Sequence, residues 1–299
     1  MSFSRNVILC ADDFGLADGV SRGIVELAER GRLSATGAMT NMPGWRRAAP
    51  DLRPLRGRIA VGLHLNLTAG APLGPMPNLA PSGLFPALGD LLPMALRRRL
   101  PAAEIAREIG RQLDAFLEAH GEAPAFVDGH QHVHVLPGIR QALIQLLTER
   151  GHAGRVWLRD PSDRWSAILR RPIGRNKALV VKSLARGFAE SAHRAGFATN
   201  EGFSGFAPLD LSVPAERVFA EAFSHLGPRP VVMCHPGHVD EELRALDPTV
   251  ESRVAELNYL KSDAFPAMME ERGLTLSSGL PVAAVIPGQT KREPRTHSP

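Results

Sequence analysis

Short apolar runs alternate with helix-like segments along most of this chain, and this alternation constrains the fold more than any other feature. The apolar runs have the length of buried strands, and the segments between them have the spacing of helices. We expect strands at Val7–Ala11, Ser34–Met39, Ile59–Leu67, Ala125–Asp128, Arg155–Leu158, Val231–Cys234 and Leu274–Leu276. Helices are expected at Asp18–Arg30, Ala102–Ala119, Gly138–Arg150, Lys182–Ala195, Pro214–Ser224 and Ser252–Glu271. Strand-helix repeats of this kind predict an α/β fold around parallel strands.

The length of 299 residues is large for an ordinary domain but lies within the range of one (β/α) barrel. We expect a single barrel domain over residues 1–286, with an insertion rich in Pro and Leu near residues 70–101. Residues 287–299 are polar, contain Pro and lack periodicity, which predicts a disordered tail.

Composition narrows the class of protein. Lys and Arg number 35 and Asp and Glu number 31, and a net charge of +4, spread along the chain, gives no reason to expect a nucleic-acid partner. Cys10 and Cys234 lie inside apolar runs, so we expect reduced thiols in a cytoplasmic protein. No signal-peptide core and no apolar stretch of membrane-spanning length is present. Contact with the inner face of a membrane and homodimer formation are left open.

Two adjacent carboxylates, Asp12 and Asp13, come directly after the first expected strand. Neighbouring negative charges repel each other, so a nearby cation or reacting proton explains their presence better than folding alone. One carboxylate would hold a metal and the other would handle a proton. The alternative is a helix start, because Asp caps helices well.

Histidines lie in or directly after two further expected strands. In Ile59–Leu67 aliphatic residues alternate with small or polar ones, so His64 and Asn66 share one face. A lone histidine at such a position is commonly a hydrogen-bonded core residue. Near the other end of the fold, Val231–Cys234 is a buried-strand pattern that ends at His235, where barrel enzymes place their chemistry.

The densest histidine group lies in Phe126–Val135. If this segment is extended, Asp128, His130, His132 and His134 project to one side. Burying these groups is costly unless each ring nitrogen has a partner, and metal coordination supplies one. A solvent-exposed His-rich loop is the alternative, which the alternating apolar residues disfavour.

Four segments, Ala11–Leu16, Gly62–Asn66, Asp128–His134 and Met233–Pro236, together resemble the successive motifs of the YdjC-like carbohydrate deacetylases. The resemblance runs from Asn6 to about Leu276. It implies an irregular TIM-like barrel with one divalent ion held by Asp13, His64 and His130, with Asp12 as the catalytic base and His235 as the acid. Gln131 stands where some relatives carry a further histidine.

Beside these residues, a supporting set is expected to orient the ligands or contact substrate, and it comprises Asn66, Asp128, His132, His134 and Arg159. Arg159 either pairs with Asp12, binds sugar hydroxyls or forms a surface ion pair with Asp160 or Asp163. Zinc suits the mixed nitrogen and oxygen ligands best, while Ni, Co, Mn or Mg remain alternatives.

The amino-acid sequence around the motifs resembles the hopanoid-associated branch of the family most, notably at Leu33–Thr36, Met39–Trp45 and Trp157–Asp163. The expected substrate is therefore an N-acetylglucosamine carried by a hopanoid lipid, whose N-acetyl group is removed by hydrolysis. The alternatives are a chitooligosaccharide deacetylase, a metal-dependent phosphoesterase, and a non-catalytic sugar-binding or metal-storage protein. Residues 70–101 and 165–182 mix aliphatic and basic side chains and either contact a membrane or form a lid.

Overall fold

The computed structural model describes residues 4–208, 210–247 and 250–280. Its centre is one curled sheet in which every strand pair is parallel. The strands are β1 (Arg5–Phe14), β2 (Ala35–Ala38), β3 (Ala60–Leu65), β4 (Phe126–Gly129), β5 (Trp157–Leu158), β6 (Ala198–Thr199), β7 (Phe203–Ser204), β8 (Val231–Cys234) and β9 (Leu274–Leu276). They run in the order β6-β5-β4-β3-β2-β1-β8-β7, and β9 pairs with β1. This arrangement confirms the predicted α/β barrel.

The barrel is irregular because β6 and β7, the two ends of the strand order, are not paired with each other in the described part of the chain. Only Asn200, Glu201 and Gly202 separate these short strands in sequence. β1 is the longest strand, and its first half pairs with β9 while its second half lies between β2 and β8. This strand therefore carries its last residues to the middle of the site.

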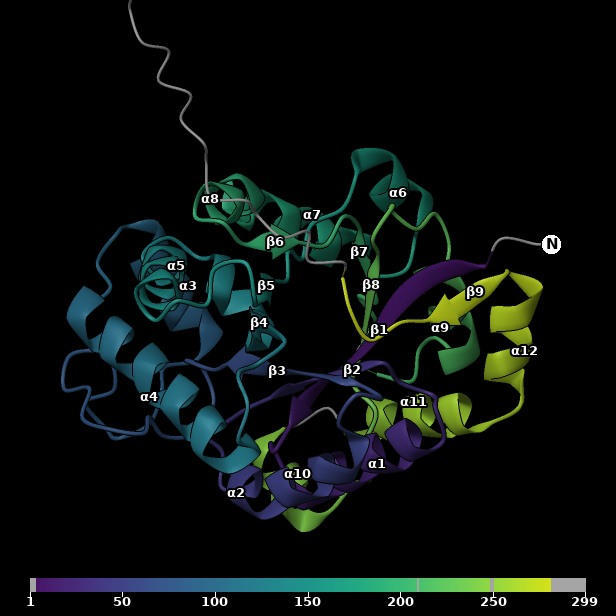
Figure 1. Ribbon diagram of the computed structural model, residues 1–299, viewed down its shortest axis with the longest axis horizontal. Coiled ribbons are helices and arrows are strands. Elements are labelled where there is room, and N and C mark those ends of the chain that lie inside the picture. The colour runs from purple at the N-terminus through teal and green to yellow at the C-terminus, as the bar shows by residue number, and fades with distance from the viewer. Residues whose placement is uncertain (1–3, 209, 248–249, 281–299) are drawn as a thin grey trace, which may run out of the picture.

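Helices surround the outside of the sheet, as Figure 1 shows. They are α1 (Asp18–Glu29), α2 (Gly44–Ala48), α3 (Leu88–Leu96), α4 (Ala102–His120), α5 (Ile139–Glu149), α6 (Trp165–Arg170), α7 (Arg175–Leu184), α8 (Phe188–Arg194), α9 (Ala215–Ala222), α10 (Glu241–Leu246), α11 (Glu251–Lys261) and α12 (Ala264–Glu271). Two 3-10 segments are η1 (Ala49–Leu55) and η2 (His130–Val135). Within the described residues, no helix combines the length and apolarity needed to span a bilayer.

The strands divide the hydrophobic core into two layers. Outward-facing residues such as Leu9, Leu63 and Val232 join one large cluster with the helices. A smaller cluster, which includes Cys10, Phe126 and other inward-facing side chains, fills the barrel interior. Successive strand side chains point to opposite faces, so this division confirms the two-residue period predicted for the strands.

Three expectations about the elements were wrong. The expected helix Lys182–Ala195 is two helices, α7 and α8, with Gly187 between them at φ +77°. The expected helix Ser252–Glu271 is likewise divided, because Ser262 after α11 has extended backbone. The histidine segment is not extended, since β4 ends at Gly129 and η2 follows. The predicted tail, residues 287–299, lies outside the described residues.

The insertion near residues 70–101 is held against α4 by buried polar side chains. Glu104 accepts hydrogen bonds from the backbone amides of Asn78 and Leu79, and Glu108 accepts one from the amide of Leu73. Helix α4 therefore carries polar residues on a buried face because the loop amides need acceptors there. These contacts make the insertion a packed cover on the barrel.

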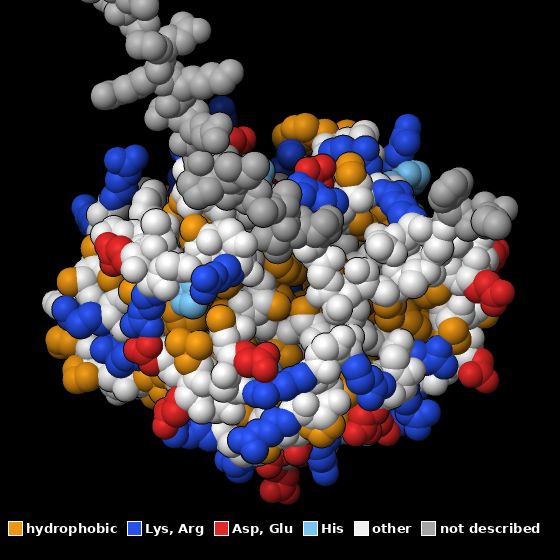
Figure 2. Space-filling model, viewed as in Figure 1, with side chains coloured by type: hydrophobic (Ala, Val, Ile, Leu, Met, Phe, Trp, Pro, Cys, Tyr) orange, Lys and Arg blue, Asp and Glu red, His pale blue; other side chains and the backbone are white. Residues whose placement is uncertain are grey.

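The surface mixes charged and apolar side chains. On the face drawn in Figure 2, Lys and Arg side chains lie among Asp and Glu side chains, with hydrophobic atoms between them. Leu84 and Leu96 of the insertion and Trp165 of α6 are each more than half exposed. Contact of these two segments with a membrane stays a prediction.

Candidate metal centre

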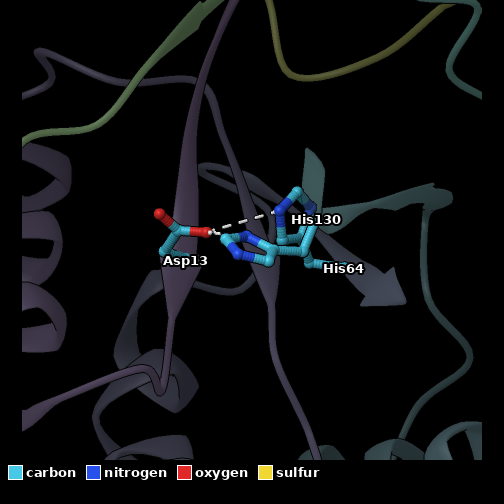
Figure 3. A group of neighbouring side chains, drawn as sticks. All are labelled: Asp13, His64 and His130. Atoms are coloured by element: carbon cyan, nitrogen blue, oxygen red, sulfur yellow. Dashed lines mark hydrogen bonds and ion pairs between the residues drawn. The ribbon is translucent and has the colours of Figure 1, made fainter. Parts of the chain in front are cut away.

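Asp13, His64 and His130 converge at the carboxyl ends of β1, β3 and β4. Figure 3 shows the two imidazoles pointing toward one oxygen of Asp13. Asp13 Oδ1 lies 3.0 Å from His130 Nδ1 and 3.4 Å from His64 Nε2. The three ligand atoms lie within 4.8 Å of one another. Parallel strands end at the same edge of a sheet, which is why residues distant in sequence meet here.

The backbone around these residues adopts rare conformations. Asp13 has φ +72°, and Gln131 and His132, which follow His130, have φ +51° and +59°. The pairing of β1 with β2 also shifts register between Ala11 and Phe14, which is a bulge at the two carboxylates. Positive φ in non-glycine residues costs roughly 1–3 kcal/mol each, and such strain concentrates at functional sites.

The carboxylate of Asp128 fixes the orientation of His64. Asp128 Oδ1 lies 2.6 Å from His64 Nδ1, and both side chains are buried. Although burial opposes a charged ring, the carboxylates of Asp128 and Asp12 raise the pKa of His64 to about 10. At neutral pH the metal-free ring is therefore protonated, and a metal ion would bind Nε2 by displacing its proton while Asp128 keeps its contact with Nδ1. One carboxylate and two imidazoles in this arrangement fit a divalent metal ion.

Arg159, directly after β5, binds both oxygens of Asp12. The distances are 2.7 Å from Nη1 to Oδ1 and 2.8 Å from Nη2 to Oδ2. Burial opposes ionisation of Asp12, but the guanidinium holds the pKa of this carboxyl well below its usual range. Arg159 is completely buried, so a surface ion pair with Asp160 or Asp163 is wrong and the pairing with Asp12 is confirmed.

His235 follows β8 on the other side of β1 from His64. Its backbone N–H donates to Glu256 Oε2 at 2.6 Å. Its ring Nδ1 is buried and has no hydrogen-bond partner among the described residues. Burial lowers the pKa of His235, while the nearby charges of Asp13 and Asp12 act in the opposite direction. Cys234 is paired in register with Ala11, so His235 follows β8 where Asp12 follows Ala11 on β1, and its ring keeps a nitrogen available for a proton.

The family described as YdjC-like protein matches residues 6–271. The chain belongs to the YdjC-like family.

The chitooligosaccharide deacetylase of Enterobacter sp. (strain 638) is 33% identical to this YdjC-like protein over 277 residues, which cover 92% of this chain and 98% of that protein. The chitooligosaccharide deacetylase of Escherichia fergusonii is 32% identical over 281 residues, with coverages of 93% and 99%. A crystal structure of a protein from Enterococcus faecalis V583 matches with a TM-score of 0.68 at 22% identity, covering 92% of this chain and 97% of that one. The structural match supports the fold.

Two buried charged residues of the YdjC-like site, both on α11, are absent from the sequence prediction. Arg253 Nη2 donates to Asp13 Oδ2 at 2.7 Å, and Glu256 accepts the hydrogen bond from His235. Burial raises the pKa of Glu256 to about 7, even though the His235 amide and Arg253 act to lower it. Both residues share the buried helix face with Leu257 and Leu260. A charged residue spaced three or four positions from apolar residues of the same helix lies on its buried face, and this spacing is the signal that could have identified both residues.

Two other predicted residues, His132 and His134, contact side chains and backbone around this centre. His134 Nε2 lies 2.7 Å from the carbonyl oxygen of Arg159, and burial lowers the pKa of His134 to about 4. His132 packs edge-on against Phe203 and Phe206, with ring centroids 5.7 and 5.5 Å away. The His134 ring therefore contacts the backbone of Arg159, and the His132 ring contacts two phenylalanine rings.

Asn66 lies in the loop that begins the insertion. Its Oδ1 accepts hydrogen bonds from the amides of Thr68 and Ala69, and its Nδ2 donates to the carbonyl of Ala69. The side chain is fully buried. These hydrogen bonds stabilise the conformation of the loop.

A second group, Cys10, Asp12 and Asp128, also brings three ligand atoms within 4.8 Å of one another. Arg159 Nη1 already lies there, 2.7 Å from Asp12 Oδ1 and 2.8 Å from Asp128 Oδ2. The guanidinium balances these carboxylates, so the group needs no metal ion.

Proposed function

We propose that this YdjC-like carbohydrate N-deacetylase hydrolyses the N-acetyl group of an N-acetylglucosamine unit in a chitooligosaccharide. The observation that carries the proposal is the convergence of Asp13, His64 and His130 beside a second carboxylate, Asp12. Relatives named chitooligosaccharide deacetylases are 32–33% identical and cover almost the whole chain, which supports this substrate class.

The ligand set suits one divalent cation, and zinc is our first choice because its usual ligands are imidazoles and carboxylates. Such an ion, when bound, polarises a carbonyl oxygen and lowers the pKa of a bound water to about 7. Asp13, His64 and His130 would hold it, and Asp128 keeps the His64 ring in place.

Asp12 is the proposed general base. The carboxylate is ionised at neutral pH, but the low pKa imposed by Arg159 makes it a weak base, so the proposed role rests on its position directly beside the metal ligand Asp13. Because Arg159 binds both of its oxygens, the direction in which Asp12 presents its charge is fixed. The acceptor of the water proton is thus in position before substrate binds.

His235 is the proposed general acid. Amide cleavage needs a proton on the departing nitrogen, and His235 follows Cys234, which is paired in register with Ala11, the residue before Asp12. Because burial lowers its pKa, the ring is mostly neutral at neutral pH, so His235 would have to take up a proton before it donates one to the amine. The products are acetate and a free amino sugar.

The finer assignment to the hopanoid-associated branch has less support. It rests on the resemblance of segments such as Met39–Trp45, whereas the two relatives named above carry the name chitooligosaccharide deacetylase. The chitooligosaccharide is therefore the substrate we propose, and the lipid-linked sugar is an outcome of the test.

The test incubates zinc-loaded protein with diacetylchitobiose and, separately, with an N-acetylglucosaminyl hopanoid lipid, followed by mass analysis for acetyl loss. We expect acetate from diacetylchitobiose, turnover slowed by roughly 100-fold or more in Asp12→Asn, and unchanged zinc binding by that variant. Asp51→Asn, at an exposed position, is the matched control. Acetyl loss from the lipid alone would exclude the chitooligosaccharide, and full turnover by Asp12→Asn would exclude Asp12 as the base.

A further inference from the structure

We propose that Arg253 is a positioning residue that keeps Asp13 a one-oxygen ligand of the bound metal. The proposal rests on the metal centre of the proposed function and adds a residue from α11 to it. Its basis is the division of the two Asp13 oxygens between different partners.

Asp13 Oδ1 and Oδ2 face opposite surroundings. Oδ1 faces the imidazoles, 3.0 Å from His130 Nδ1 and 3.4 Å from His64 Nε2. Oδ2 accepts a hydrogen bond of 2.7 Å from Arg253 Nη2. Asp13 is 1% exposed and Arg253 is 4% exposed, so water does not compete for this contact. One oxygen is thus left for a cation and the other is held by the guanidinium.

Arg253 is itself fixed from several sides. The same Nη2 donates to Asp247 Oδ2 at 2.9 Å, and the carbonyl oxygen of Arg253 accepts a hydrogen bond from the amide of Gly237 at 3.2 Å. One helical turn later, Glu256 accepts the amide of His235. Helix α11 therefore contacts both the end of β1 and the loop after β8, and the guanidinium has little freedom to release Asp13.

The consequence for a bound metal follows from coordination chemistry. A carboxylate that binds through both oxygens occupies two coordination positions, whereas one that binds through a single oxygen occupies one. A catalytic site needs positions for water and substrate. A buried arginine beside a cation is unfavourable on charge alone, so its presence is better explained by control of the Asp13 carboxylate than by metal affinity.

The experiment compares cobalt-loaded wild-type protein with Arg253→Gln and Arg253→Lys. The visible absorption of Co²⁺ weakens as its coordination number rises, so the spectrum, normalised to bound cobalt, reports whether Asp13 has become a two-oxygen ligand. We expect a weaker spectrum and at least a tenfold lower kcat in Arg253→Gln, with little change in KM. Arg253→Lys, which keeps the charge but loses the planar guanidinium that contacts both Asp13 and Asp247, should be intermediate.

Arg244→Gln is the matched control, because Arg244 forms an exposed ion pair with Glu251 at the start of α11. It should keep the wild-type spectrum and kcat. A wild-type cobalt spectrum in folded Arg253→Gln overturns the proposal, even if activity falls. Should that variant not fold, a wild-type spectrum in Arg253→Lys overturns it instead.

The spectra are independent of the reaction. A wild-type protein that binds cobalt but releases no acetate would contradict the proposed function, while the comparison between Arg253 variants would still decide this inference.

Discussion

Arg159 and Asp12 form a two-point ion pair inside the barrel, with hydrogen bonds of 2.7 and 2.8 Å and no exposed surface on the guanidinium. The same Nη1 lies 2.8 Å from Asp128 Oδ2. One cation therefore compensates two buried carboxylates, one that is the proposed base and one that orients His64.

Replacing Arg159 with Met should be strongly destabilising, because it leaves two buried carboxylates without a cation. Breaking a buried ion pair costs about 3–5 kcal/mol in the free energy of unfolding. Urea unfolding measures this change, and Arg46→Met, which loses an exposed pair with Glu118, is the control. An equal stability loss in both variants would contradict the central role of Arg159.

Replacing Asp128 with Asn should weaken metal binding by roughly 10- to 100-fold, because the His64 ring loses its charged partner. The relevant contact is the 2.6 Å approach of Asp128 Oδ1 to His64 Nδ1. Calorimetric titration with zinc measures the affinity. Asp114→Asn, at an exposed position paired with Arg150, should leave the affinity unchanged.

Removing the metal should abolish turnover and lower thermal stability together. A ligand at about 100 times its dissociation constant stabilises the folded state by about 2.7 kcal/mol. We expect Tm to fall on treatment with chelator and to recover with added zinc. His64→Ala should have a Tm that does not respond to zinc, and a strong response of that variant would place the metal elsewhere.

The buried carboxyl of Glu256 should make stability depend on pH. Its pKa is raised from 4.5 to about 7, so between these values only the folded state binds the proton. Stability from this group is therefore present at low pH and is lost as the pH rises through 7. The difference corresponds to about 3 kcal/mol, at about 1.36 kcal/mol per pH unit.

Glu256→Gln should lack this decline. We expect urea unfolding of metal-free protein at about pH 5 and about pH 8, on either side of the raised pKa, to show a smaller loss of stability in the variant than in wild type. Glu190→Gln, at an exposed position, should follow the wild-type pH dependence. Parallel pH curves for wild type and Glu256→Gln would contradict the raised pKa.

Gln112 links α4 to the loop that begins the insertion. Its Oε1 accepts the amide of Asn66 at 3.0 Å, and its Nε2 donates to the carbonyl of Asn66 at 2.7 Å. Gln112→Ala leaves these buried backbone groups unpaired, which costs about 1–3 kcal/mol each. We expect faster proteolysis within residues 70–101, while Gln145→Ala, an exposed change, should match wild type.

Much of the fold could be predicted because its signals are local. Apolar alternation identified most strands of the barrel, and Gly31, shortly after the first helix, has the left-handed φ of +67° that glycine favours at a helix end. The two-residue strands β6 and β7 escaped prediction because glycines at 196, 202 and 205 interrupt their segment, whereas the equally short β5 lies within the apolar run Val156–Leu158. The prediction that the histidine segment is extended was wrong. Gln131 and His132 have left-handed backbone, which interrupts the strand despite the alternating apolar residues.

By itself the sequence determined the parallel barrel and placed Asp12, Asp13, His64, His130 and His235 at or directly after the carboxyl ends of strands. Parallel strands end at one edge of the sheet, so these residues meet without further information. Tertiary structure alone decided which side chains would hold them in place. Arg253 is 240 residues from Asp13, and Arg159 is 147 residues from Asp12. Hydrogen bonds over such separations leave no periodic trace, because they depend on how helices and loops pack around the strands.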